Sequence, residues 1–143
     1  MPTSLQSRAR VVIGDDNDTT LQTISRIVRV QFDVVGTVRD GETAVNSIEL
    51  LKPDVLVLDV FLPALDGIQV VRRLKTLGSS PQVVILTGLE GQAFVDAAMI
   101  AGASAFVFKR RMAVDLLLAI REVLAGRIFV SADYPEDIEQ RSK

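Results

Sequence analysis

The sequence predicts one α/β domain built on a parallel β-sheet, and two observations carry that prediction. Short runs of Val, Ile, Leu and Phe alternate with longer segments whose apolar residues recur every three or four positions, the pattern of repeated strand–helix units. The strand-like runs are apolar throughout rather than alternating, as expected for a sheet that helices cover on both faces. A chain of 143 residues is long enough to bury one core of this kind.

The strands are predicted where runs of β-branched and large apolar residues end in polar ones. The run at 33–38 is the weakest, because Gly36 and Thr37 interrupt it. In chain order, the five predicted strands cover residues 9–14, 33–38, 55–58, 83–86 and 105–108.

The first three helices are predicted from their start and stop signals. The first begins at Asn17 or Asp18, whose side chains suit an N-cap, and carries an apolar stripe toward the sheet. The second opens at Asp40 and ends before Pro53, which forces the preceding residue out of helical geometry. The third starts at Asp66, followed by glycine.

The last two helices are predicted over residues 91–101 and 113–125, and glycines end both of them, Gly102 and Gly126. Apolar side chains on the final helix occupy more than the single stripe that one buried face requires. Two interpretations stay open at this point. Either the helix packs deeply on several sides, or part of its apolar surface faces a partner.

Composition excludes several function classes. The net charge is −2 and the pI is about 5.1, so there is no basic footprint for nucleic acid. The chain has neither cysteine nor histidine, which excludes disulfides, thiolate chemistry, imidazole metal sites and histidine-based acid–base catalysis. The N-terminus lacks the apolar segment of a signal peptide and no stretch is long enough to span a bilayer. We therefore expect a cytoplasmic protein without membrane contact.

Polar side chains follow four of the predicted strands at the point where each ends. These side chains are Asp15, Asp16, Asp59, Thr87 and Lys109. The carboxyl ends of parallel strands with right-handed crossovers share one edge of the sheet, where ligands bind in open α/β folds. The five groups are therefore predicted to form one site.

The grouping favours a divalent cation and phosphoryl chemistry. Two carboxylates about 4 Å apart repel by about 4 kcal/mol at an effective dielectric constant of 20, so three of them favour a bound cation. Mg²⁺ is the candidate, because it prefers oxygen ligands. Asp59 stands alone and suits a nucleophile that forms an aspartyl-phosphate, whereas the Asp15–Asp16 pair suits the metal. Those two residues could instead cap the first helix, but Asn17 and Asp18 already serve that purpose.

Four motifs, in order and correctly spaced over about residues 8–126, resemble the receiver domain of bacterial response regulators. They are Gly14-Asp15-Asp16-Asn17, the run from Val57 to Gly67 around Asp59, Leu86-Thr87-Gly88, and the run from Gly102 to Lys109. The resemblance implies a three-layer (βα)₅ flavodoxin-like fold with strand order 2-1-3-4-5. It also implies a receiver domain over 8–130 between flexible termini at 1–7 and 131–143.

The resemblance implies a role for each site residue. A sensor histidine kinase would phosphorylate Asp59, Lys109 would pair with the phosphoryl group, and Thr87 would act as the switch hydroxyl. Phe106 would be the aromatic residue that turns inward when Thr87 moves. Mg²⁺ would be held by Asp15, Asp16, Asp59 and the backbone carbonyl of Phe61. No enzymatic activity is implied beyond the domain's own phosphorylation and dephosphorylation.

The final helix and the residues after it resemble NarL/LuxR-type receivers that precede a helix-turn-helix. This chain is too short to hold that DNA-binding domain, so it is either a stand-alone receiver or a fragment of a DNA-binding regulator. For the chain itself we expect no direct contact with nucleic acid. Its output would be binding to a downstream protein partner or to a second copy of itself.

Two other functions compete with the phosphorylated switch. A phosphohydrolase of the haloacid dehalogenase type generally needs a second acid two residues after the nucleophile, and that position is Phe61. A pseudo-receiver would bind partners without phosphorylation, but the chain keeps all five site residues.

The chain also departs from the family pattern. Arg110 and Arg111 follow the lysine, and Phe61 and Leu89 are apolar where water would approach, which predicts slow self-dephosphorylation.

Overall fold

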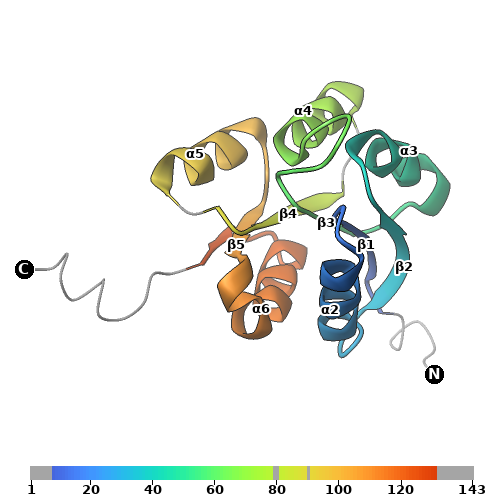
Figure 1. Ribbon diagram of the computed structural model, residues 1–143, viewed down its shortest axis with the longest axis vertical. Helices are drawn as coiled ribbons and strands as arrows, with labels where there is room; N and C mark the ends of the chain where they lie inside the picture. Colours follow the sequence, from blue (N-terminus) through green and yellow to red (C-terminus); the bar gives the residue numbers. More distant parts are fainter. Residues whose placement is uncertain (1–7, 79–80, 90, 132–143) are drawn as a thin grey trace, which may run out of the picture.

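The computed structural model describes residues 8–78, 81–89 and 91–131, and these form a single parallel sheet with helices on both faces (Figure 1). The six strands lie in the order β2-β1-β3-β4-β5-β6, which confirms the predicted order and adds one strand. The strands are β1 (Arg10–Gly14), β2 (Asp33–Val38), β3 (Val55–Leu58), β4 (Gln82–Thr87), β5 (Ala105–Phe108) and β6 (Phe129–Val130).

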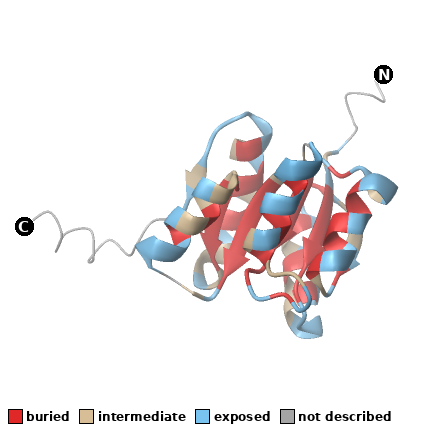
Figure 2. Cartoon of the chain, turned by 90° about the horizontal axis from the view of Figure 1, so that it is seen from above, coloured by how far each residue is buried: buried red, intermediate tan, exposed pale blue. Residues whose placement is uncertain are grey.

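Helices α3 (Gly41–Leu51), α4 (Gly67–Leu77) and α5 (Gln92–Ala101) cover one face of the sheet, and α2 (Asp18–Val28) and α6 (Met112–Leu124) cover the other (Figure 1). Each face has its own apolar core, since side chains alternate across a strand. Strands β3 and β5 are buried at every position, whereas the helices alternate buried and exposed residues (Figure 2).

The helix ends follow the predicted chemistry. Asn17 accepts a hydrogen bond from the Thr20 amide, and Asp40 does the same for Thr43. Asp66 forms a reciprocal capping box, because the N3 side chain also accepts from the backbone N–H of Asp66.

Two elements were not predicted, the strand β6 and a 3₁₀ turn at Lys109–Arg111 that joins β5 to α6. Neither has a periodic signal in the sequence. A two-residue strand is too short for one, and the turn consists of three basic residues without an apolar position. Residues 1–7, 79–80, 90 and 132–143 lie outside the described part of the chain, and so do the predicted N-terminal tail at 1–7 and nearly all of the predicted C-terminal tail at 131–143.

The structure favours one of the two interpretations of the final helix. Leu116 and Ile120 are fully buried, but Val114 is 68% and Leu118 is 38% exposed. The surplus apolar side chains of α6 therefore lie at the surface rather than in a deeper core. Within the described residues, no helix is long and apolar enough to cross a membrane.

The register of the sheet brings the strand ends together. Gly14 pairs with Leu58 across β1 and β3, Leu58 pairs with Ile85 across β3 and β4, and Thr87 pairs with Phe108 across β4 and β5. The residues that follow these pairs leave the sheet at a common edge, as the parallel arrangement requires.

Candidate functional site

The site is organised around the side chain of Lys109, which bridges two buried carboxylates. Its Nζ lies 2.8 Å from Asp15 Oδ2 and 2.8 Å from Asp59 Oδ2. Asp15 is 1% exposed and Asp59 is 7% exposed. The fold thus joins side chains from the ends of β1, β3 and β5, and the sequence correctly predicted that these three would meet.

Local backbone geometry fixes both carboxylates. Asp15 Oδ1 accepts the amide of Asn17 at 2.9 Å, and Asp59 Oδ1 accepts the amide of Phe61 at 3.1 Å. Each aspartate therefore holds one oxygen toward its own loop and presents the other to Lys109. The Asp59 amide in turn donates to the carbonyl of Gly14 at 3.0 Å, which ties the β3 end to β1.

The electrostatics of the pair follow from burial and these contacts. Burial raises the pKa of Asp59 above its ordinary value, although hydrogen bonds from Lys109 and from the Phe61 amide act in the opposite direction. Burial alone would lower the pKa of Lys109, but its hydrogen bonds to Asp15 and Asp59 outweigh that effect and raise it. Lys109 is therefore a fixed positive charge at neutral pH.

Thr87 lies at the end of β4, and Phe106 lies on the neighbouring strand β5, whose end carries Lys109. The Thr87 side chain is fully buried, and its Oγ1 accepts the Leu89 amide at 3.2 Å. Phe106 is also fully buried and packs edge-on against Phe108, with the ring centroids 5.9 Å apart. In this conformation the aromatic side chain on β5 therefore points inward.

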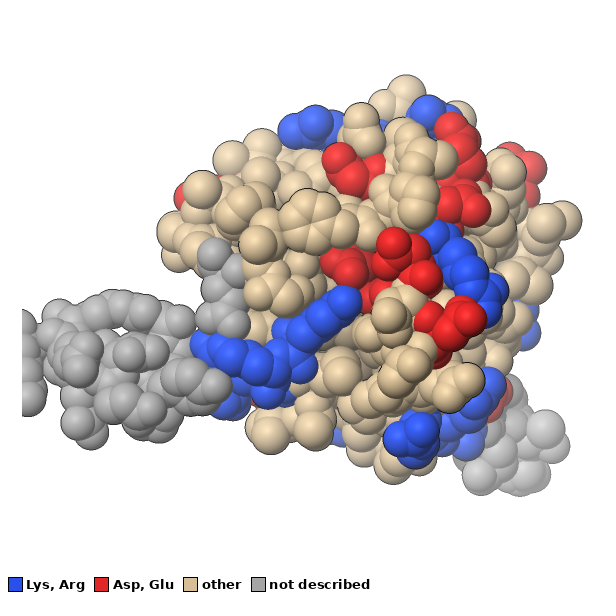
Figure 3. Space-filling model, in the orientation of Figure 1, with Lys and Arg blue, Asp and Glu red and all other residues tan. Residues whose placement is uncertain are grey.

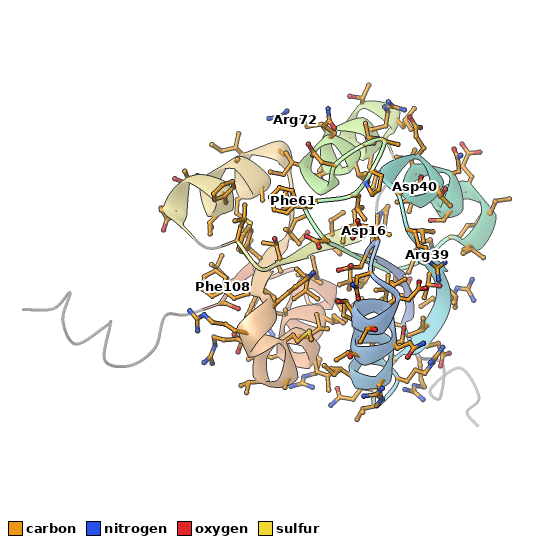
Figure 4. The ribbon with its side chains drawn as sticks, in the orientation of Figure 1. Asp16, Arg39, Asp40, Phe61, Arg72 and Phe108 are labelled. Atoms are coloured by element: carbon orange, nitrogen blue, oxygen red, sulfur yellow. The ribbon has the colours of Figure 1, made fainter. Side chains whose placement is uncertain are left out.

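Asp16 and Phe61 lie at the rim of the site, on the loops that follow β1 and β3 (Figure 4). Asp16 is exposed, and the Phe61 side chain is 57% exposed. Among the described residues there is no group of three or more acidic side chains arranged to hold a metal ion. The structure thus brings together two of the three carboxylates expected to form a cluster.

The donor set nevertheless suits a hard divalent cation. The oxygens that converge are carboxylate oxygens of Asp15 and Asp59, and the chain has no cysteine or histidine to supply the thiolate or imidazole ligands that softer metals prefer. Acidic side chains gather in the middle of this face, and basic ones run up to them from the side of β5 and α6 (Figure 3).

Two features around the site had not been recognised in the sequence. A Cβ atom added to Gly67 would lie 2.5 Å from the Asp59 carbonyl oxygen, so this glycine allows α4 to start directly against the phosphoacceptor candidate. Asp115 and Ser131 are buried and hydrogen-bonded to each other, and each also bonds to a residue within two positions of Lys109. Only the Asp66-Gly67 pair carried a sequence signal, and we interpreted it as a helix start.

Comparison with known proteins gives consistent matches. The profile of the family described as "Response regulator receiver domain" matches residues 11–121. The response regulator GacA of Pseudomonas aeruginosa is 30% identical over 135 residues, which cover 93% of this chain and 63% of GacA. The curated relatives it matches are longer proteins, of which the chain spans about two thirds or less.

Solved structures agree with this family. A LuxR-family two-component response regulator from Aurantimonas sp. SI85-9A1 superposes with a TM-score of 0.84 at 32% identity, covering 96% of this chain and all of that one. The isolated receiver domain of RcsB from Salmonella enterica serovar Typhimurium, solved in the presence of phosphomimetic BeF₃⁻, has a TM-score of 0.80 at 25% identity. That match covers 87% of this chain and 94% of the RcsB chain.

Proposed function

The chain belongs to the response regulator receiver domain family, and on that premise we propose that it is a phosphorylation-dependent signalling switch with Asp59 as its phosphoacceptor. The observation that carries the proposal is the Asp59–Lys109–Asp15 bridge. A buried carboxylate beside a fixed ammonium combines a nucleophile with a group that stabilises phosphoryl charge. We place the receiver domain over residues 8–130.

The reaction is an in-line transfer from a phosphohistidine of a sensor histidine kinase. An oxygen of Asp59 attacks phosphorus, the P–N bond breaks, and the electron pair leaves with the imidazole nitrogen. Lys109 already contacts Asp59 Oδ2, so this oxygen becomes available only when the ammonium moves to a phosphoryl oxygen. Because the donor is made with ATP, we place the exchange in the cytoplasm.

Mg²⁺ belongs to this proposal through the oxygen donors of the site. Asp15 and Asp59, with Asp16 and the Phe61 carbonyl at the rim, would hold the ion. When bound, it neutralises charge on the transferring phosphoryl group.

The proposed output is a change in a protein-binding surface. In the unphosphorylated protein the Thr87 hydroxyl accepts a hydrogen bond from the Leu89 amide. In the phosphorylated state this hydroxyl donates to a phosphoryl oxygen instead and moves away from Leu89. Phe106, which is already buried in this conformation, then changes its packing, and the surface made by α5, β5 and α6 changes. The exposed apolar residues Val114 and Leu118 on α6 are available for a partner protein or a second copy of the chain.

We also propose slow loss of the phosphoryl group. Phe61 and Leu89 flank Asp59 and Thr87 with apolar side chains, neither of which can orient an attacking water by a hydrogen bond. A phosphoryl lifetime of seconds at room temperature would contradict this part of the proposal.

A second candidate is a receiver that forms part of a DNA-binding regulator. Two observations favour this candidate. The chain matches only about half of the length of the transcriptional regulatory protein DegU of Brevibacillus brevis, and that relative, at 28% identity, is described as a transcriptional regulator. The switch chemistry would be the same, and only the output would differ. The third candidate is a pseudo-receiver that binds partners without phosphorylation.

The deciding experiment is intact-mass spectrometry after incubation with acetyl phosphate and Mg²⁺. We expect one phosphoryl adduct on the parent and none on Asp59→Asn. Asp66→Asn is the matched control, since it neutralises a nearby acid while keeping an N-cap side chain, and it should still be phosphorylated. No adduct on the parent, with Mg²⁺ binding shown separately, would favour the pseudo-receiver.

A further inference from the structure

A buried hydrogen-bonded cluster holds the chain on both sides of Lys109. The Phe108 amide, directly before the lysine, donates to Ser131 Oγ at 3.1 Å. Ser131 Oγ donates to Asp115 Oδ2 at 2.8 Å. Arg111, two residues after the lysine, pairs with the same carboxylate through Nε at 2.9 Å. Asp115 and Ser131 are each only 5% exposed.

These contacts connect three elements around one backbone corner. Ser131 follows β6, and its amide donates to the Phe106 carbonyl of β5 at 2.9 Å, so the residue is bonded to β5 through both side chain and backbone. Asp115 lies in the first turn of α6, where a negative charge is favoured by the helix dipole. The 3₁₀ turn Lys109–Arg111 is therefore held at both ends.

The reach of Lys109 depends on that corner. A lysine side chain has a flexible four-carbon stem that does not by itself hold the ammonium in one place, so a fixed Cα position increases the fraction of time in which the ammonium bridges both carboxylates. No proline follows Lys109 to restrict the backbone there, because the next residues are Arg110 and Arg111. The Asp115–Ser131 cluster supplies the restriction instead.

The buried Arg111–Asp115–Ser131 cluster is not explained by a gain in the stability of the fold. A buried ion pair loses much of its Coulombic gain to desolvation, and apolar residues of similar volume often stabilise as well or better. What it does provide is directional bonds to Phe108 and Arg111. We infer that Asp115 and Ser131 are positioning residues for Lys109, an inference that rests on the proposed function because Lys109 acts there on the phosphoryl group.

A coupling between β6 and the site follows. A phosphoryl group that draws Lys109 away from Asp15 displaces the turn Lys109–Arg111, and the residue before this turn, Phe108, is hydrogen-bonded to Ser131. By thermodynamic reciprocity, a contact that displaces β6 must change the phosphorylation equilibrium by the same factor.

The test compares Ser131→Ala and Asp115→Asn with Ser104→Ala. The control also removes a hydroxyl from a hydrogen bond, but next to the opposite end of β5, where Ser104, the residue before the strand, donates through Oγ to Gln82. Thermal unfolding of each variant confirms that it folds. Two readouts follow, the rate of phosphorylation by acetyl phosphate and the ¹⁵N NMR signal of the lysine ammonium groups.

The chain has only four lysines, so the Lys109 signal can be assigned by comparison with Lys109→Met. We expect both cluster variants to broaden or lose that signal and to be phosphorylated about tenfold more slowly, as for other residues that orient a site from behind. Ser104→Ala should match the parent in both.

Each remaining outcome decides the matter. Slower phosphorylation with an unchanged Lys109 signal would overturn the positioning role, and so would two unchanged readouts. A changed Lys109 signal with an unchanged phosphorylation rate would overturn it too, because the position of the ammonium would then not matter for the transfer. If the parent takes no phosphoryl group, the proposed function fails. The ammonium signal of the Ser131→Ala protein still tests the positioning role in that case, because that readout needs neither metal nor phosphate.

Discussion

Replacing Gly67 by alanine tests whether the start of α4 sets the position of Asp59. The added Cβ would lie 2.5 Å from the Asp59 carbonyl oxygen and 3.0 Å from Val60 Cα. Both are backbone atoms, so no side-chain rotation can relieve the contact. Gly67 also donates its amide to the Val60 carbonyl at 2.8 Å, which prevents the helix from moving away without losing a hydrogen bond.

The size of the effect follows from two opposing terms. Overpacking a closed site costs about 1–3 kcal/mol, and contact with rigid backbone places Gly67→Ala near the upper end. Removing a glycine from the unfolded chain returns about 0.4–1 kcal/mol. We expect a net loss of about 2 kcal/mol in the free energy of unfolding, or a fall in melting temperature of roughly 8 °C.

The matched control is Gly88→Ala, on the loop that follows Thr87. A Cβ there would meet no atom within 4 Å, and Gly88 does not have a positive φ. Its free energy of unfolding should stay within about 0.5 kcal/mol of the parent value. Urea titration measures both variants, and acetyl phosphate labelling should be slower only in Gly67→Ala. Equal stability of the two variants would refute the steric argument.

Four further predictions concern charge, capping and water. The variant Lys109→Met removes the ammonium between Asp15 and Asp59. Each of their Oδ2 atoms lies 2.8 Å from Nζ, so the two oxygens are at most about 5.6 Å apart and repel by about 3 kcal/mol at an effective dielectric constant of 20. The melting temperature of this variant should therefore fall at pH 7 and recover near pH 4, where carboxylates begin to take up protons. Burial raises the pKa of Asp59 in the folded protein above 3.8, its ordinary value. The protonated Asp59 carboxyl therefore stabilises the fold fully below pH 3.8, and this stabilisation is lost as the pH rises through the raised pKa of the folded state. Asp59→Asn should therefore gain stability relative to the parent between pH 4 and 7 in urea titrations, and a constant difference would contradict the shift. Asp66→Ala should lose about 1 kcal/mol by the same assay, whereas Asp66→Asn should lose little. Phe61→Gln should shorten the phosphoryl lifetime, measured by decay of the mass adduct, and an unchanged lifetime would show that Phe61 does not exclude water.

The sequence predicted those parts of the molecule that depend on local chemistry. Strands 55–58 and 105–108 have the predicted bounds because continuous apolar runs are read directly from the chain, and strand 33–38 has them although Gly36 and Thr37 interrupt its run. Asp15, Asp59 and Lys109 could be brought together because parallel strands end at one edge.

The remaining features depend on contacts between distant residues. Asp115 and Ser131 are 16 positions apart and meet only because β6 pairs with β5. A strand of two residues is too short to give a recognisable sequence pattern, so this pairing could not be predicted. The sequence predicted a cluster of Asp15, Asp16 and Asp59, but the direction of the Asp16 side chain is set by the loop after β1. Within the described residues Asp16 is exposed, and no three acidic side chains are grouped to hold a metal ion. Gly67 was interpreted by its place in the chain, whereas its packing against Asp59 requires the tertiary structure.

The salt bridge at Lys109 gives the protein its own counterion. The ammonium already compensates the two buried carboxylates, so folding does not have to wait for a dissolved cation. The resting protein should then fold and unfold cooperatively in the presence of a chelator, without added magnesium. A demand for the metal would arise only when a phosphoryl group recruits the lysine and leaves the aspartates in need of a replacement.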